Sequence, residues 1–405
     1  MVQSGAVSQF EILCCSPAFL PADSHGGLPY STFNLCRALI HAGARVTVVT
    51  TDRNGDRRLD VATDRWTSYE DVRVWYASTR SGPFVFAPSA KTAIAETMPS
   101  TDCVIGSGTL WVHLGWLAWR AARRHGKPRL EYPRGLLDLW AYRHKALRKQ
   151  AYWHAVGKRI LDEAAVVVAL TEQERQRLRD LHVTNRIEVI PNGAASEMSA
   201  EPVGRDWLDA RYPALRGRRY VLFLGRVHEK KGLDVLLPAV AALSARHDRV
   251  AFVIAGPIAS SFEARWRALV AEHRLEDTLI LPGPVSGTTK AAWLAHADLF
   301  VLPSYSEGMP MAALEALRAG CPVVLTKACA LPEVEDAHAG LVIDPDVGQL
   351  VGALSALLDD APRRQMMAQH ARALAATNFN WDTIGERTLA LCRSVAASAC
   401  SSPRK

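Results

Sequence analysis

Short runs of strand length alternate with longer helical patterns along most of this chain. In the first half, such runs cover 10–15, 46–50, 72–76, 102–105, 129–132, 166–170 and 187–191. A pattern of helical periodicity fills 28–42 and ends at Gly43. Near-continuous apolar strands are typical of parallel sheets, because helices cover both faces of such a sheet. The alternation therefore predicts an α/β domain with right-handed connections.

This alternation stops between 194 and 217, a stretch that contains several proline and glycine residues, and it resumes after residue 217. Further strand-like runs cover 220–224, 250–255, 278–281, 299–302, 323–326 and 341–343. A chain of 405 residues is too long for one ordinary domain. We therefore predict two similar α/β domains, 1–200 and 201–380, followed by an amphipathic helix and a tail at 381–405.

The stretch 303–323 combines a turn, a helix and the start of a strand. It reads PSYSEGMPMAALEALRAGCPV, which places Glu307 on the turn and Glu315 in the helix. Pro310 is expected at the first helical position, which needs no backbone N–H. Helical side chains lean towards the amino end, so both carboxylates are expected to face one crevice. Helix amino termini attract phosphate and carboxylates bind hydroxyl pairs, which predicts a site for a sugar and a diphosphate.

A second loop, 225–232, reads GRVHEKKG and follows the strand-like run 220–224. Arg226 and Lys231 are expected at the carboxyl edge of this strand, facing the same crevice as Glu307. Two fixed cations there would neutralise a diphosphate and the charge that develops on it when a glycosidic bond breaks. Taken alone, a charged loop is usually only exposed to solvent, and an isolated glutamate is more often a surface residue than a ligand-binding one.

Together these motifs resemble the retaining glycosyltransferases of family 4, whose signature is two glutamates separated by seven residues. The resemblance implies the GT-B fold, in which two Rossmann-like parallel-sheet domains face each other across a cleft and the final helix crosses back to the first domain. It implies that Arg226 and Lys231 bind the diphosphate of a nucleotide sugar, that Glu315 holds the ribose and that Glu307 holds the transferred sugar. Arg226, Lys231 and Glu307 are then the catalytic residues. The backbone of Gly308, Met309, Pro310 and Met311 would face sugar and phosphate, and the loop at Gly26 and Gly27 would close over the donor.

The sequence departs from the family at Arg134. Many relatives have a histidine at this place, before Gly135, and an arginine cannot act as a base near neutral pH. Arginine pairs bidentately with phosphate, so Arg134 is a candidate phosphate or acceptor contact. We expect neither a metal nor another cofactor. The tripeptide Asp344–Pro345–Asp346 is better explained as a helix cap than as a metal site.

Positive charge is concentrated in one block, 120–159, which holds twelve Lys and Arg against two acidic residues, whereas the whole chain carries +7. Its second half, 140–159, predicts a helix that mixes these cations with Trp and Tyr. Such a helix suits an anionic membrane surface, and a solvated basic face explains it equally well. No run approaches the roughly 18 apolar residues of a membrane span, and residues 1–9 lack a secretory signal. We therefore expect a cytoplasmic protein, with the inner face of the membrane as a second possible location.

The motifs together predict a transferase that moves a sugar from a nucleotide sugar to a saccharide or a lipid-linked saccharide in cell-surface polysaccharide synthesis. Three other classes are considered. A nucleotide-sugar epimerase would need acids and bases at the sugar carbons, and a non-catalytic GT-B scaffold subunit would not need the complete set of charged residues. A nucleic-acid-binding protein is disfavoured because the sequence contains no recognised nucleic-acid module.

Overall fold

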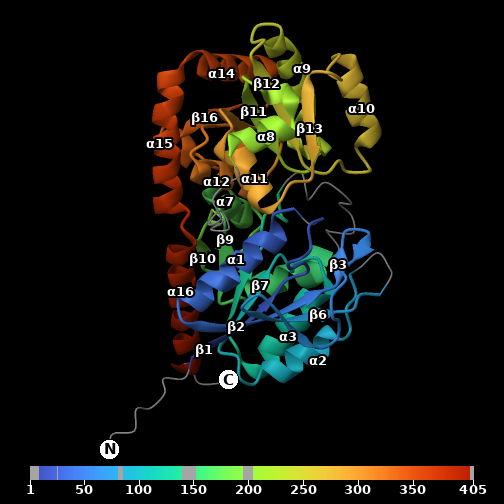
Figure 1. Cartoon of the computed structure of the whole chain (residues 1–405). Helices are drawn as coiled ribbons and strands as arrows, with labels where there is room; N and C mark the ends of the chain where they lie inside the picture. The colour runs from blue at the N-terminus through green and yellow to red at the C-terminus, as the bar shows by residue number, and fades with distance from the viewer. Residues whose placement is uncertain (1–8, 25, 81–84, 139–151, 195–203, 402–405) are drawn as a thin grey trace, which may run out of the picture. The chain divides into compact units, whose positions relative to one another are not determined.

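The computed structural model describes residues 9–24, 26–80, 85–138, 152–194 and 204–401, and it divides into two compact units (Figure 1). The N-terminal unit comprises 1–192 together with 381–405, and the C-terminal unit comprises 193–380. The boundary expected from the sequence, at residue 200, lies outside the described residues. The fold class is confirmed, because each unit is built on a parallel sheet with helices on both of its faces.

The N-terminal unit is organised around an eight-stranded sheet with the order β10-β9-β8-β7-β1-β2-β6-β5. All neighbouring strands are parallel except β5, which pairs antiparallel with β6. The strands are β1 (Phe10–Cys15), β2 (Ala44–Thr51), β5 (Trp66–Tyr69), β6 (Val72–Ala77), β7 (Cys103–Ser107), β8 (Arg129–Tyr132), β9 (Val166–Ala169) and β10 (Ile187–Val189), and a separate hairpin joins β3 (Arg53–Asn54) to β4 (Arg57–Arg58).

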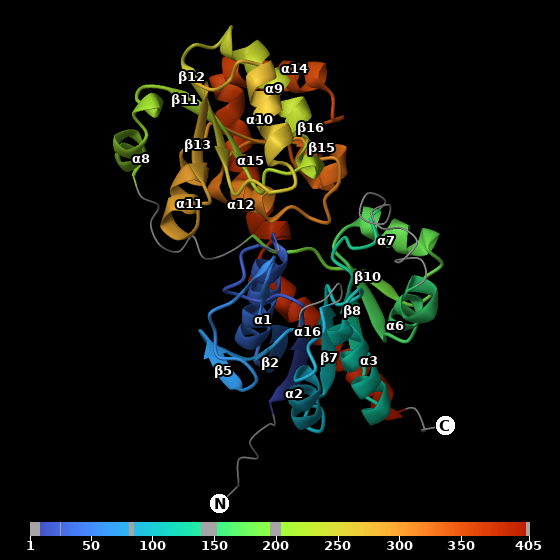
Figure 2. The same ribbon diagram turned by 90° about the vertical axis from the view of Figure 1, so that its right-hand side faces the viewer.

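Helices cover both faces of this sheet (Figure 2). They are α1 (Leu28–His41), α2 (Ala90–Thr97), α3 (His113–His125), α6 (Lys158–Asp162), α7 (Glu172–Asp180) and α16 (Trp381–Ser401). The helices α2 and α3 pack on one face around Leu13, Val49 and Val104. On the other face, α16 lies against α1 so closely that a Cβ atom at Gly385 would be 2.5 Å from the carbonyl oxygen of Ala38. The last helix of the chain therefore completes the first unit.

The C-terminal unit contains a six-stranded, fully parallel sheet with the order β13-β12-β11-β14-β15-β16. Its strands are β11 (Arg219–Leu224), β12 (Val250–Ala255), β13 (Leu279–Gly283), β14 (Leu299–Leu302), β15 (Val323–Thr326) and β16 (Gly340–Ile343). Its helices are α8 (Arg205–Arg211), α9 (Leu233–Ser244), α10 (Glu263–Glu272), α11 (Gly287–Ala295), α12 (Met311–Ala319), α13 (Glu333–Asp336), α14 (Val347–Asp359) and α15 (Ala361–Asn378). The helix α9 packs with α14, and α12 packs with α11 and α15.

Several local predictions are corrected. The stretch expected to be a linker, 194–217, contains the helix α8. The antiparallel strand β5 was not expected, because its sequence WTSY has no clear apolar alternation. The expected helix at 140–159 lies mostly outside the described residues, and its described end is a π-helical turn at Trp153–Gly157 followed by α6. Pro310 is the N-cap of α12 and not its first helical residue. No helix among the described residues is both long and apolar enough to cross a membrane.

Candidate active site

Two loops of the C-terminal unit meet at the point where its strand order reverses. The first strand, β11, has β12 on one side and β14 on the other, so the connections from β11 and β14 leave neighbouring parallel strands in opposite directions. The carboxyl ends of such strands form a crevice in which open α/β sheets bind ligands. The loop 225–232 follows β11, and the loop 303–310 follows β14. The motifs identified in the sequence therefore lie beside each other.

Backbone contacts fix one loop against the other. The backbone N–H of Tyr305 donates to the carbonyl oxygen of Lys230 over 2.9 Å. Gly232 has a φ of +66°, and a Cβ atom added to it would lie 2.0 Å from the carbonyl oxygen of Pro303. Only glycine combines this φ with so close an approach. The hydroxyl of Tyr305 also donates to Asp234 over 2.9 Å, which ties the second loop to the start of α9.

The side chain of Lys231 reaches across this junction to Glu307. Its Nζ atom lies 2.5 Å from Oε1 of Glu307, and the hydroxyl of Ser304 donates to the same oxygen over 2.6 Å. Burial by itself raises the pKa of the Glu307 carboxyl, but Lys231, Lys230 and the hydroxyl of Ser304 outweigh burial, so the net pKa is lowered. Glu307 is therefore an anion held in place, with 9% of its side chain exposed. It is an acceptor for hydroxyl groups and not a proton donor.

Glu315 has its own cation, which the sequence analysis missed. Glu315 lies in the second turn of α12 and exposes only 7% of its side chain. The Nζ atom of Lys290, in α11, lies 2.8 Å from its Oε1 atom. One feature of the sequence could have indicated this role, because Lys290 is the single charged residue of the α11 sequence GTTKAAWLA. A lone lysine in an otherwise uncharged helix is consistent with a specific partner across a tertiary contact.

The remaining predicted residues of this unit surround the same edge of the sheet. Arg226 is exposed and forms no hydrogen bond or ion pair with any described residue. Met309 and Met311 are each 8% exposed, and Gly308 is half-buried between the loop and the helix. The N-cap residue Pro310 forms no side-chain cap hydrogen bond, so the first N–H groups of α12 are not satisfied by a cap. Such a terminus suits an anionic ligand.

His228 has a structural role within the first loop. Its Nδ1 atom accepts a hydrogen bond from the backbone N–H of Lys230 over 3.2 Å, which caps the short helical turn before Gly232. Partial burial and then the cation of Arg226 lower the pKa of His228, which favours the neutral ring that can accept this bond. The residue thus helps to set the position of Lys231.

The predicted residues of the N-terminal unit lie in two loops of that unit. Arg134 has a φ of +57°, and its guanidinium donates to the hydroxyl groups of Ser107 (2.9 Å) and Ser31 (3.3 Å) and to the side chain of Asn192 (2.5 Å). The residue is half-buried, and these three hydrogen bonds fix the position of its guanidinium. Gly26 has a φ of +65°, and Gly27 is the N-cap of α1.

Glu174 positions the Arg134 loop through a hydrogen bond to the backbone of Gly135. The hydroxyl of Thr171 caps α7 by accepting from the backbone N–H of Glu174 over 3.1 Å. The carboxylate of Glu174 accepts from the backbone N–H groups of Gly135 (2.6 Å) and Leu170 (2.7 Å). Burial raises the pKa of Glu174 to about 7, against the opposing effect of these two hydrogen bonds. Its charge state therefore affects the backbone next to Arg134.

The described residues show no group of three or more His, Cys, Asp or Glu side chains arranged to hold a metal ion. Asp346 caps α14 by accepting from the backbone N–H of Gln349 over 2.9 Å, while Asp344 pairs with Lys327. The cap is therefore Asp346, with Pro345 before it. That catalysis needs no metal remains a prediction.

Both halves of the chain match models of known protein families. Residues 25–197 match the family model described as Glycosyltransferase Family 4, and residues 208–374 match the model described as Glycosyl transferases group 1. A D-inositol 3-phosphate glycosyltransferase from Stackebrandtia nassauensis is 30% identical over 306 residues, which cover 72% of this chain and 68% of that protein. This chain belongs to the family 4 glycosyltransferases. The matched stretch is shorter in other relatives of the same name, and it spans 56% of the length of those from Pseudarthrobacter chlorophenolicus and an Arthrobacter species.

Solved glycosyltransferase structures share the fold over nearly the whole chain. Sucrose-phosphate synthase from Thermosynechococcus elongatus has a TM-score of 0.79 at 22% identity, covering 96% of this chain and 100% of that one. Anabaena Alr3699/HepE in complex with UDP-glucose has a TM-score of 0.74 at 16% identity, covering 95% and 100%. At these identities the likeness concerns the fold alone.

Proposed function

We propose that this glycosyltransferase family member transfers a sugar from a nucleotide-diphosphate sugar with retention of the anomeric configuration. The observation that supports this most strongly is the pair of charge contacts at one sheet edge, Lys231 with Glu307 and Lys290 with Glu315. Cations and carboxylates so close together, beside an uncapped helix amino terminus, match the alternating anionic and hydroxyl groups of a nucleotide sugar.

Each group has a distinct role in the proposed reaction. Lys231 and Arg226 bind the diphosphate, while Glu307 accepts hydrogen bonds from hydroxyls of the transferred sugar and Glu315 accepts them from the ribose. The bond between the anomeric carbon and the diphosphate oxygen breaks, and the acceptor oxygen bonds to that carbon from the same face. The acceptor proton passes to the departing diphosphate oxygen. The two cations stabilise the charge that grows on this leaving group.

The loop of Arg134 supplies the proposed contact to the acceptor or to phosphate, and the loop of Gly26 and Gly27 closes over the donor. The acceptor is a saccharide or a lipid-linked saccharide, as in the synthesis of a cell-surface polysaccharide at the inner face of the membrane. Support for this acceptor class is the family membership and the positive charge of the N-terminal unit. No metal or cofactor takes part in the proposed reaction.

Thermal denaturation with UDP, GDP or ADP, with and without a divalent cation, tests the donor site. A ligand that binds only the folded state raises Tm, and at a concentration about a hundredfold above Kd it adds about 2.7 kcal/mol to the free energy of unfolding. We expect one diphosphate to raise Tm without a divalent cation and Lys231→Ala to abolish the shift. Arg265→Ala, which removes an exposed arginine of α10, is the matched control and should keep the full shift.

The same samples distinguish the other enzyme classes. Incubation with the corresponding nucleotide sugar and an acceptor mixture, followed by NMR of the product, should give a glycoside with the anomeric configuration of the donor. An inverted product would refute retention. Free epimerised nucleotide sugar without transfer would identify an epimerase, and absence of any Tm shift would favour the non-catalytic scaffold.

A further inference from the structure

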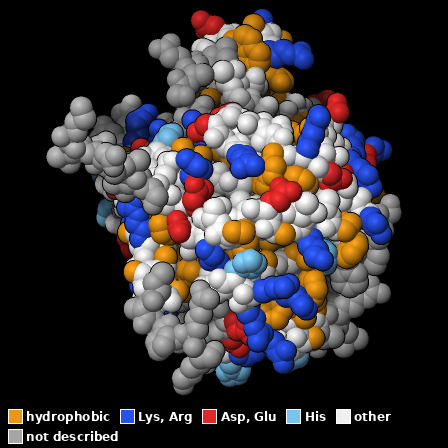
Figure 3. Space-filling view, turned by 90° about the horizontal axis from the view of Figure 1, so that it is seen from below, with side chains coloured by type: hydrophobic (Ala, Val, Ile, Leu, Met, Phe, Trp, Pro, Cys, Tyr) orange, Lys and Arg blue, Asp and Glu red, His pale blue; other side chains and the backbone are white. Residues whose placement is uncertain are grey.

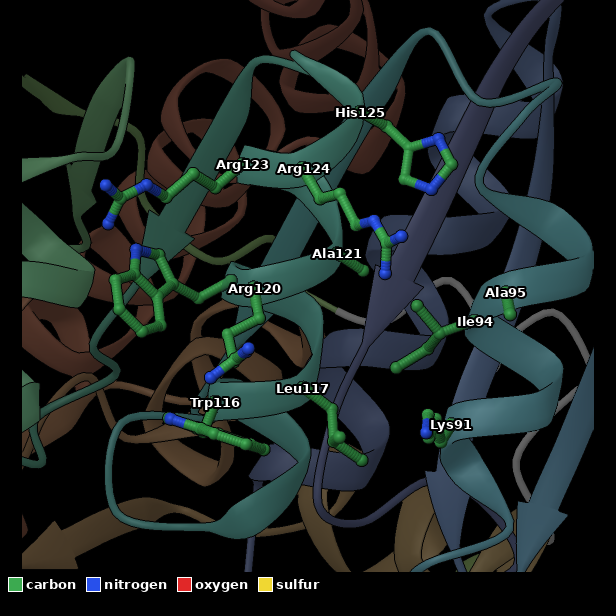
Figure 4. Close-up of a pocket in the computed structure, with 11 residues that line it drawn as sticks. Lys91, Ile94, Ala95, Trp116, Leu117, Arg120, Ala121, Arg123, Arg124 and His125 are labelled. Carbon is green, nitrogen blue, oxygen red and sulfur yellow. The ribbon is translucent and has the colours of Figure 1, made fainter.

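The helices α2 and α3 of the N-terminal unit bury one face of each against the sheet and leave an open groove between them on the outside. The buried side is formed by Leu114, Ala118 and Ala122 of α3 and by Ala90 and Ala93 of α2. The groove has a volume of about 870 Å³ (Figure 4). It lies within one unit and contains none of the residues assigned to sugar transfer.

The floor of this groove is apolar. Ile94 and Ala95 come from α2, and Leu117 and Ala121 lie one turn apart on the side of α3 that faces them (Figure 4). Ile94 is buried, Leu117 and Ala121 are half-buried, and Ala95 is exposed. Trp116 is also half-buried, on the neighbouring stripe of α3. The side chains of the groove therefore offer an apolar strip to a ligand.

Cations surround this strip. Lys91, Arg120, Arg124 and His125 are exposed, and none of them forms an ion pair with a residue in the described part of the chain. The guanidinium of Arg120 lies 4.8 Å from the ring centroid of Trp116, an arrangement that leaves its charge open to solvent. The helix α3 contains no acidic residue. In the view from below, Lys and Arg side chains lie beside exposed hydrophobic ones (Figure 3).

Two other charged side chains close to this strip have partners within the unit. Arg123, one turn after Arg120, lies 3.4 Å from Glu163, which also accepts a hydrogen bond from Trp119. Its charge is therefore compensated within the unit. Glu96, the acid of α2, accepts a hydrogen bond from Trp66. Of the cations that line the groove, Arg123 is paired, whereas Lys91, Arg120 and Arg124 have no ion-pair partner among the described residues.

We infer that the α2–α3 groove is a docking surface for an anionic phospholipid membrane. The apolar strip with Trp116 would lie at the boundary between headgroups and acyl chains, and Lys91, Arg120 and Arg124 would contact the anionic headgroups. Nucleic acid satisfies the cations but offers no acyl chain to the apolar strip. This docking differs from the helix expected at 140–159, and it is independent of the proposed sugar transfer because no transfer residue lies in the groove.

Vesicle sedimentation of the full chain tests the inference. The vesicles consist of phosphatidylcholine alone or of phosphatidylcholine with about one third phosphatidylglycerol. We expect binding only to the anionic vesicles, weakened by salt and not reduced by soluble glycerol phosphate. Each surface cation contributes about a fivefold change in affinity, so Lys91→Ala/Arg120→Ala/Arg124→Ala should weaken binding about a hundredfold.

Two further variants separate charge from the apolar strip. Arg246→Ala/Arg265→Ala/Arg267→Ala removes the same number of exposed cations from the C-terminal unit and should bind vesicles as the parent does. Trp116→Ala should weaken binding while leaving every cation in place. Both groove variants should keep the Tm shift that the nucleoside diphosphate causes, so failure of docking and failure of the donor site are distinguishable. Equal vesicle binding by the parent and the groove triple variant would overturn the inference, and so would binding to duplex DNA without binding to vesicles.

Discussion

The Nζ atom of Lys231 lies 2.5 Å from Oε1 of Glu307, although 76 residues separate the two along the chain. The contact exists because β11 and β14 are hydrogen-bonded neighbours and each is followed by a loop at the same sheet edge. The Tyr305 backbone contact to Lys230 holds these loops in register. The pair is therefore fixed by the strand order and the loop contacts of the C-terminal unit.

Acidification should test the charge state of Glu307. Its pKa is lowered in the folded protein, so its contribution to stability is present above the usual value of 4.5 and is lost as pH falls through the folded value. Below about pH 4.5, the Tm of the parent should therefore fall more steeply than that of Glu307→Gln. Parallel pH–Tm curves for the two proteins would show that Lys231 does not stabilise the carboxylate.

Removing the cation from Glu315 should damage both stability and nucleotide binding. Lys290→Met leaves a carboxylate with 7% of its side chain exposed and no counter-charge, and breaking a buried pair costs about 3–5 kcal/mol, an upper bound here because Lys290 is 19% exposed. Tm should fall, and the Kd for the nucleoside diphosphate, measured by calorimetry, should rise at least about tenfold, which corresponds to about 1.4 kcal/mol.

The double variant Lys290→Met/Glu315→Leu provides the control for that prediction. It removes both charges and replaces them with apolar groups, so it should recover most of the lost Tm. It should not recover nucleotide binding, because the ribose contact is absent. Recovery of binding in the double variant would contradict the role of Glu315.

Gly232 and Gly217 form a matched pair of glycines. Their φ values are +66° and +67°, but a Cβ atom at Gly232 would lie 2.0 Å from the carbonyl oxygen of Pro303, whereas one at Gly217 would have nothing within 4 Å. Gly217→Ala should therefore cost only the backbone strain of about 1–2 kcal/mol. Gly232→Ala should in addition separate the two loops, lowering Tm further and abolishing the diphosphate shift. Equal Tm losses in the two variants would show that the loops are not tightly packed.

Glu174 should make the stability of the N-terminal unit depend on pH with a sign opposite to that expected for Glu307. Its pKa is about 7 in the folded protein, above the usual 4.5, so the folded state retains a proton that the unfolded chain has lost between these values. The stability of the parent should fall as pH rises through this window, by at most about 1.4 kcal/mol per pH unit. Glu174→Gln cannot titrate, so the Tm difference, parent minus variant, should decrease from about pH 4.5 to about pH 7. A difference that is constant or increases would contradict the raised pKa.

Much of this site could be predicted from short stretches of sequence. The turn and helix around Glu307 and Glu315 were predictable because strand, turn glycine, helix and final Gly320 follow each other within 303–323. Lys231 was predictable as a cation at a strand end. Lys290 was not, because its partner is 25 residues away and depends on how α11 packs beside α12. The role of Glu174 was not predictable either, because its bond to Gly135 spans 39 residues.

The sequence by itself determined the two parallel-sheet units and the residues at the ends of β11 and β14, because hydrophobic periodicity and turn chemistry act within short windows of chain. Only the tertiary structure decided which charges pair and which stay open to solvent. Arg123 is compensated by Glu163, 40 residues away, whereas Arg120, in the preceding turn of the same helix, lies over Trp116. Pairing between charges depends on distances of a few ångströms between distant segments, and packing sets those distances.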